Sequence, residues 1–111
     1  MAYALIDDQY HANPKLLAAG LEAHGLHARA VSYCACYLTD GLVPKAWARA
    51  NAPKRVLDKL VAHGLLYEHP NAYEVHDYLS YNPTKEDVLK RRAEAADRKR
   101  KSRATDNGSH P

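Results

Sequence analysis

The clearest alternation of apolar and polar positions lies between Pro53 and Tyr78. Its first part carries apolar residues at helical spacing: Val56, Leu57, Leu60 and Val61. The charged residues between them fall on the other side of a helix: Lys54, Arg55, Asp58 and Lys59. This pattern predicts an amphipathic helix that packs on a core by its apolar face. Pro53 suits the first turn and Gly64 suits the position just past the last turn, so both ends are marked.

After Gly64 the period changes from helical to alternating. Residues 65–67 favour an extended strand, residues 69–72 favour a turn, and Tyr73, Val75 and Asp77 alternate with polar neighbours. We therefore expect a β-hairpin between about Leu65 and Asp77. A helix followed directly by a hairpin is the second half of a winged helix-turn-helix, where the two form the recognition helix and the wing.

Two longer helices are expected before this region, after an extended lead-in over residues 1–12 that packs on the core. Asn13 as N-cap and Pro14 at the first helical position begin a helix that we expect to end at Gly25. Its predicted buried face consists of Leu16, Leu17 and Leu21. Gly20 on the same face would let another helix approach closely.

The next helix, from about His27 to Thr39, has the cleanest apolar stripe in the chain and should be the central core helix. The stripe consists of Ala30, Val31, Cys34, Ala35 and Leu38. Asp40 and Gly41 end this helix, and residues 42–43 form a short extended link that could add a strand to the hairpin.

A short helix is expected from Pro44 to about Ala50, with Lys45 and Arg49 on one side. Asn51 and Ala52 then make the turn before the amphipathic helix. Two helices joined by so short a turn have helix-turn-helix geometry, in which one helix crosses the DNA backbone and the next enters the major groove.

The C-terminal part begins with a turn at Asn82 and Pro83, after which Thr84 caps a last helix. Val88, Leu89, Ala93 and Ala96 can still touch a core. Four acid-before-base pairs at i,i+4 support this helix through about Arg100, each by roughly 0.2 to 0.5 kcal/mol. The pairs are Glu86 with Lys90, Asp87 with Arg91, Glu94 with Arg98, and Asp97 with Lys101. Residues 104–111 are polar and interrupted by Gly and Pro, so we expect them to be disordered.

The expected fold is therefore mainly α with a small β-hairpin. It consists of a winged helix-turn-helix domain with an added N-terminal helix (residues 1–83), a basic C-terminal helix (84–103) and a disordered tail (104–111). The 111-residue length suits one domain with a modest core.

Composition excludes some classes of protein. At 46% hydrophobic and 26% charged residues the chain is typical of a soluble globular protein, and no apolar run approaches the roughly 20 residues of a membrane span. The first residues have neither a basic start nor an apolar stretch of secretory length, so we expect a cytoplasmic protein without membrane contact.

Charge is distributed unevenly along the chain. Residues 1–83 carry seven Lys or Arg against eight Asp or Glu, whereas residues 84–111 carry nine against five. The net positive charge therefore lies in the C-terminal quarter, which indicates a basic appendage for a polyanion.

No cofactor, metal or catalytic site is predicted. Cys34 and Cys36 point in different directions around a helix, and the seven histidines show no zinc-ligand spacing. A glycine-rich phosphate loop, a nucleophile elbow and a paired-carboxylate motif are all missing, so we do not expect an enzyme.

Several longer runs carry a family resemblance: LTDGLVPKAW, the HGLLYE junction between helix and hairpin, and the HDYLSYNPTKEDV exit into the last helix. Over roughly residues 14–103 the chain resembles the winged-helix domains of small phage-encoded DNA-binding proteins of actinobacteria. These are related to the N-terminal domains of phage replisome organisers and replication initiators. The resemblance implies sequence-specific or origin-type binding of double-stranded DNA in replication or transcription control, with replication or transcription proteins as further partners.

The predicted DNA-binding residues divide into two groups with different tasks. Lys54, Arg55 and Lys59 would donate to guanine edges in the major groove. The others would hold phosphates: Lys45, Arg49, His69, Asn71, Lys90, Arg91, Arg92, Arg98, Lys99, Arg100, Lys101 and Arg103.

A second reading stays open. Winged helices also serve as protein-interaction modules without sequence-specific DNA binding, and eight tyrosines with one tryptophan could form a binding face. The oligomeric state and the DNA target sequence are not determined by one chain.

Overall fold

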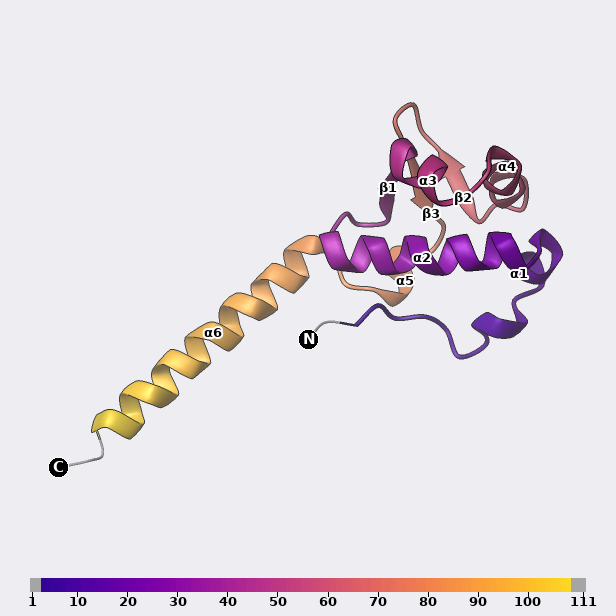
Figure 1. The fold of residues 1–111 in the computed structure, drawn as a ribbon. Coiled ribbons are helices and arrows are strands. Elements are labelled where there is room, and N and C mark those ends of the chain that lie inside the picture. Colours follow the sequence, from indigo (N-terminus) through magenta and orange to yellow (C-terminus); the bar gives the residue numbers. More distant parts are fainter. Residues whose placement is uncertain (1–2, 109–111) are drawn as a thin grey trace.

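A computed structural model describes residues 3–108 of the chain. The protein is mainly helical, with a small three-stranded antiparallel sheet (Figure 1). The helical elements are η1 (Tyr10–Ala12), α1 (Pro14–Ala19), α2 (Leu21–Tyr37), α3 (Lys45–Asn51), α4 (Lys54–Ala62), α5 (Tyr78–Tyr81) and α6 (Lys85–Gly108). The strands are β1 (Leu42–Pro44), β2 (Leu66–Glu68) and β3 (Ala72–Val75). The sheet, α3 and α4 lie on one side of the long helix α2.

The first helical region breaks at Gly20, five residues before the predicted end at Gly25. Gly20 has a φ of 100° and separates α1 from α2, whereas Gly25 lies inside α2. The prediction was wrong because the buried positions Ala23, Leu26 and Ala30 continue one helical stripe through Gly25. Within residues 3–108 no atom lies within 4 Å of a Cβ placed on Gly20, so the close helix approach expected there is not formed in this part of the chain.

Only part of the predicted buried face of α1 is buried. Leu16 is in the core, but Leu17 is 61% exposed, and Leu21, which begins α2 after the break at Gly20, is 88% exposed. The α2 stripe is confirmed through Ala30, Val31 and Cys34.

The predicted hairpin is confirmed, with slightly different bounds. β2 pairs with β3 in antiparallel register, Tyr67 opposite Glu74, and the turn over residues 69–71 is closed by a hydrogen bond from the His69 N–H to the Ala72 carbonyl. Leu65 precedes β2, and Asp77 follows β3 with a left-handed φ of 59°. The extended link also adds the expected strand, because β1 pairs with β3 on its other edge.

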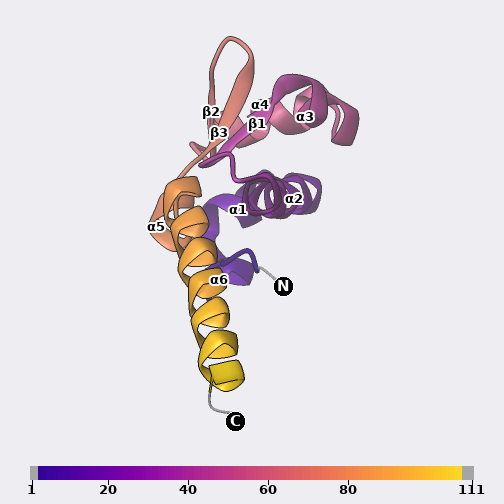
Figure 2. The same ribbon diagram turned by 90° about the vertical axis from the view of Figure 1, so that its left-hand side faces the viewer.

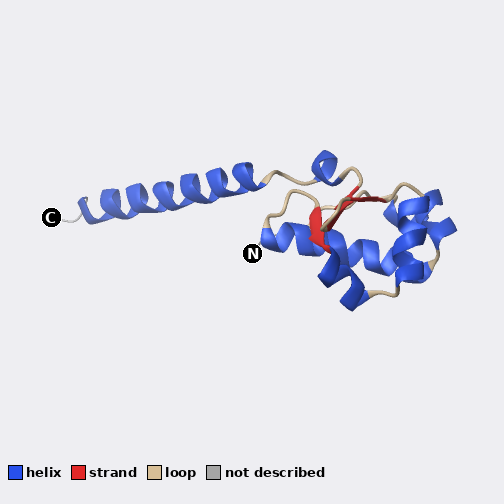
Figure 3. Cartoon of the chain, turned by 90° about the horizontal axis from the view of Figure 1, so that it is seen from above, coloured by secondary structure: helices blue, strands red, loops and turns tan. Residues whose placement is uncertain are grey.

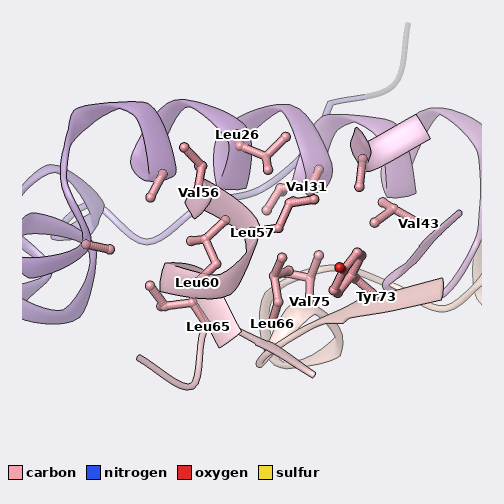
Figure 4. Close-up of a cluster of buried hydrophobic side chains, with 14 of the residues drawn as sticks. Leu26, Val31, Val43, Val56, Leu57, Leu60, Leu65, Leu66, Tyr73 and Val75 are labelled. Carbon is pink, nitrogen blue, oxygen red and sulfur yellow. The ribbon is translucent and has the colours of Figure 1, made fainter. Parts of the chain in front are cut away.

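The core lies between α2, α4 and the sheet (Figure 4). α4 contributes Val56, Leu57 and Leu60, each at most 1% exposed, as its apolar pattern predicted. These side chains face Leu26 and Val31 of α2 and the sheet residues. Burial of this face fixes which side of α4 is left for solvent.

The N-terminal lead-in packs on the body, as predicted. The buried side chain of Asn82 accepts a hydrogen bond from the Leu5 N–H (2.8 Å) and donates one to the Leu5 carbonyl (3.0 Å). Farther along, the Tyr10 hydroxyl lies 2.8 Å from Nδ1 of His27. Burial raises the pKa of Tyr10 to about 12, and burial together with His24 and His76 lowers the pKa of His27 to about 4.

α6 begins where two side chains cap its first turn. The Thr84 hydroxyl accepts from the Asp87 N–H at 3.1 Å, which confirms the predicted cap, and Asp40 Oδ1 accepts from the Lys85 N–H at 2.6 Å. The second contact ties the turn after α2 to the start of α6, across 45 positions of sequence.

α6 then continues to Gly108, beyond the predicted end near Arg100. The tail predicted to be disordered begins at residue 104; α6 includes residues 104–108, and residues 109–111 lie outside the described part. Of the four expected pairs, Asp97 with Lys101 is formed at 3.1 Å, and the other three are not in ion-pair contact within residues 3–108.

The apolar residues expected to touch a core contribute little. Val88 is half-buried, whereas Leu89, Ala93 and Ala96 are exposed, and no side chain of residues 85–103 is buried. α6 thus projects from the body as an arm (Figure 2), and the molecule measures 68 × 30 × 20 Å.

Replacing Asp40 by Ala should cost about 1 kcal/mol of stability, because it removes the acceptor for a free N–H in the first turn of α6. The free energy of unfolding measured in urea checks this. Asp40→Asn keeps an acceptor and tolerates the left-handed φ of 53°, so it should cost clearly less. Equal losses for both variants would mean that charge, rather than capping, is what Asp40 contributes.

Candidate nucleic-acid interface

The solvent face of α4 carries the three cations predicted to read bases. Lys54, Arg55 and Lys59 are all exposed, with Asp58 among them. They reach this position because Val56, Leu57 and Leu60 fix the opposite face of the helix in the core. The face therefore presents donors to solvent with a modest positive balance.

Arg55 has a partner that the sequence did not reveal. Its Nη2 lies 3.0 Å and 3.2 Å from the two carboxylate oxygens of Glu22 in the first turn of α2. Both side chains are about three-fifths exposed. Exposed pairs of this kind contribute roughly 0 to 1 kcal/mol, so the guanidinium can exchange Glu22 for another acceptor at little cost.

Lys45 was predicted to contact phosphate from the surface, but the structure places its side chain in contacts within the protein. Its Nζ lies 3.1 Å from Glu68 of β2 and 5.5 Å from the centre of the Tyr73 ring, and the side chain is only 16% exposed. The backbone N–H of Lys45 also donates to the Asn71 carbonyl at 3.2 Å. This lysine joins α3 to the hairpin, and its charge is compensated there.

The hairpin does not carry the positive potential expected of a phosphate-binding wing. His69 Nε2 lies 3.1 Å from Glu74 on the neighbouring strand, and Glu68 lies at the end of β2. Asn71 is exposed at the tip. Two acidic residues therefore accompany the two residues predicted to contact phosphates, and one of these two, His69, is paired with Glu74.

Arg49 is exposed in the last turn of α3, and a further exposed cation that was not predicted as a contact, Arg29, lies in α2. Arg29 of α2 donates to the side chain of Asn51 at 3.3 Å, so the α3–α4 turn is tied to α2. No periodic signal identified Arg29, because the contact joins residues 22 positions apart.

The remaining predicted cations lie along α6 and are exposed: Lys90, Arg91, Arg92, Arg98, Lys99, Arg100, Lys101 and Arg103. Asp97 pairs with Arg100 at 3.0 Å and with Lys101 at 3.1 Å. The structure does not bring this group together with the α4 group. Viewed from above, α6 extends to one side while α3 and α4 lie at the other end of the molecule (Figure 3).

Other kinds of site gain no support in residues 3–108. No group of three or more His, Cys, Asp or Glu in this range could hold a metal ion. Within the same residues, no helix has the length and apolar character needed to cross a membrane.

Comparisons with protein-family models, with curated proteins and with solved structures find no match to this chain.

Proposed function

We propose that the chain is a DNA-binding protein of phage or prophage origin that acts in replication or transcription control. In this proposal the fold is a winged helix, α4 enters the major groove, and no residue is catalytic. The family resemblance of the sequence suggested this function, and the arrangement of α3, α4 and the hairpin supports it.

The observation that carries the proposal is the two-sided character of α4. One side is held in the core by three fully buried residues, and the other presents Lys54, Arg55 and Lys59 to solvent. The helix follows α3 after a two-residue turn and is followed by a hairpin, with strands ordered β1-β3-β2. A helix held this way presents Arg and Lys at fixed spacing, which is what base recognition in the major groove requires.

The ion pairs of the structure narrow the set of contacts. We assign base contacts to the α4 cations and phosphate contacts to Arg49 and Asn71. Lys45 and His69 serve instead to hold the hairpin, because each is paired with a glutamate. A wing with so little net charge would add little nonspecific affinity for DNA. The net positive charge of the chain lies instead in its C-terminal part, which forms α6.

Changing Arg55 to Ala should cost roughly 1 to 3 kcal/mol on a selected cognate duplex and have little effect on random DNA. The reason is that a bidentate arginine contact discriminates one base, whereas nonspecific affinity comes from phosphates. Electrophoretic shift titrations on both duplexes at one salt concentration measure the difference.

Glu22→Gln is the matched control for this experiment. It releases Arg55 without removing it, so binding to the cognate duplex should be kept or strengthened. Equal losses of Arg55→Ala on cognate and random DNA would reassign Arg55 to a phosphate contact.

The protein-interaction reading has one observation in its favour. Tyr33, Tyr37 and Trp47 form a surface cluster between α2 and α3, with ring centres 4.7 to 4.8 Å apart and Tyr37 65% exposed. Aromatic residues are enriched in protein interfaces. Binding that weakens steeply with salt and needs no protein partner would favour DNA over this alternative.

A further inference from the structure

The two cationic surfaces lie at opposite ends of α2. α4 packs near its first turns, where Arg55 meets Glu22, and α6 starts beyond its last turn, where Asp40 caps Lys85. The stretch from Glu22 to Tyr37 rises about 22 Å along the helix axis. The arm then carries its cations still farther from α4.

The surfaces also lie on different sides of the molecule. α3, α4 and the hairpin are on one side of α2, whereas α6 runs away on the other side in two perpendicular views (Figures 1 and 2). A straight DNA duplex bound across α3, α4 and the hairpin would therefore not contact α6.

α6 carries a cationic stripe that net charge alone does not reveal. At 3.6 residues per turn, four of its cations fall within an arc of about 40°. They are Lys85, Arg92, Lys99 and Arg103. All four are exposed and make no ion pair within residues 3–108. The acids Glu86, Asp87, Glu94 and Asp97 lie on the other side of the helix, so between Lys85 and Arg103 the stripe contains no acidic residue of α6.

The stripe suits a polyanion backbone. From Lys85 to Arg103 it extends about 27 Å, and a duplex presents one phosphate for about every 1.7 Å of its axis. Lys85 was not among the predicted contacts, although its spacing of seven residues from Arg92 and Lys99 was visible in the sequence.

We propose that one chain holds two DNA segments at once, one at α4 and the other along the α6 stripe, and so bridges them. The inference rests on the proposed function, because α4 must itself bind DNA. DNA is stiff below about 150 base pairs, and bending a site by 40 to 90° costs about 1 to 6 kcal/mol. Binding a second, separate duplex along α6 requires no bending and so avoids this free-energy cost.

The test uses the full chain with two short duplexes of about 16 base pairs, one carrying a donor dye and the other an acceptor dye; duplexes of this length behave as rods. Energy transfer between the dyes reports a complex that contains both duplexes. Sedimentation equilibrium gives the number of chains in it. The expected complex has one chain and two duplexes.

A triple variant tests the stripe itself: Arg92→Gln, Lys99→Gln and Arg103→Gln. Losing three phosphate contacts should weaken binding of the second duplex by about a hundredfold at about 0.1 M salt, and the first duplex should stay bound. The matched control, Lys90→Gln, Arg98→Gln and Lys101→Gln, removes the same charge from the other side of α6 and should weaken binding of the second duplex clearly less. Circular dichroism checks that both retain the helix, since Gln forms helices nearly as well as Lys and Arg.

The outcomes separate the inference from the function on which it rests. Binding of one duplex with no energy transfer would overturn bridging and leave the proposed function standing. Failure to bind any duplex at low salt would overturn the proposed function. Equal loss in both triple variants, or two chains in each bridged complex, would overturn the assignment of the second duplex to the stripe of one chain.

Discussion

Truncating the chain after Asp97 should lower its affinity for random-sequence DNA and flatten the dependence of binding on salt. The truncation removes five cations: Arg98, Lys99, Arg100, Lys101 and Arg103. Each phosphate contact releases counterions and contributes about 0.9 log unit of binding per log unit of salt, so the slope should fall by up to roughly four or five units. The effect is large because electrostatic contacts supply nearly all of nonspecific binding.

The folded body should survive this truncation. Residues 98–103 are exposed, and the caps at the start of α6 are retained. Truncation after Arg103 is the control, since it shortens the chain without removing Lys or Arg. Titrations over a salt series compare both with the full chain. Unchanged affinity and slope after truncation at Asp97 would make α6 a solvated or protein-binding helix, and the protein-interaction alternative would then become the stronger one.

Acidification should destabilise the protein through His27. This side chain is 8% exposed and faces Tyr10 of η1, His24 of its own helix and His76 after β3. Its pKa is lowered from 6.5 to about 4 in the folded state, first because burial disfavours the charged ring. The unfolded chain therefore binds a proton more readily than the folded one below about pH 6.5.

The sign of the effect follows from this difference. Above pH 6.5 His27 is neutral in both states and its burial costs no extra stability. As the pH falls toward 4 the unfolded chain takes up the proton first, so the free energy of unfolding decreases, by about 2 kcal/mol at pH 5 and about 3 kcal/mol at pH 4. Urea unfolding at pH 7 and pH 5 measures it. In His27→Gln the part of the loss due to this side chain should vanish, whereas His11→Gln, at an exposed position, should keep it. The same loss with and without His27 would assign the acid sensitivity to other groups.

Local patterns were sufficient for the elements whose signals are short in sequence. The apolar spacing in residues 56–61 and the change of period at Gly64 predicted α4 and the hairpin, and the extended link 42–43 became β1. Thr84 was correctly identified as a cap. These elements follow from backbone preferences and side-chain periodicity, which act over a few residues and are therefore visible in the sequence.

The break between the first two helices shows where local signals compete. Both Gly20 and Gly25 were possible helix ends, and glycine marks such ends without deciding between them. Packing decided: Ala23, Leu26 and Ala30 are buried against the rest of the protein when α2 runs through Gly25. Burying this stripe outweighs the roughly 1 kcal/mol that a glycine costs inside a helix.

The sequence by itself determined the kinds of elements, the cationic face of α4 and the basic character of the C-terminal helix. Only the tertiary structure decided which charges are compensated and where the two cationic surfaces lie. Arg55 meets Glu22 across 33 positions, and Lys45 meets Glu68 across 23. The direction of α6 depends on Asp40, 45 positions before Lys85. The physical reason is that electrostatic contacts depend on distance in space, which the fold of the core sets and no sequence period encodes.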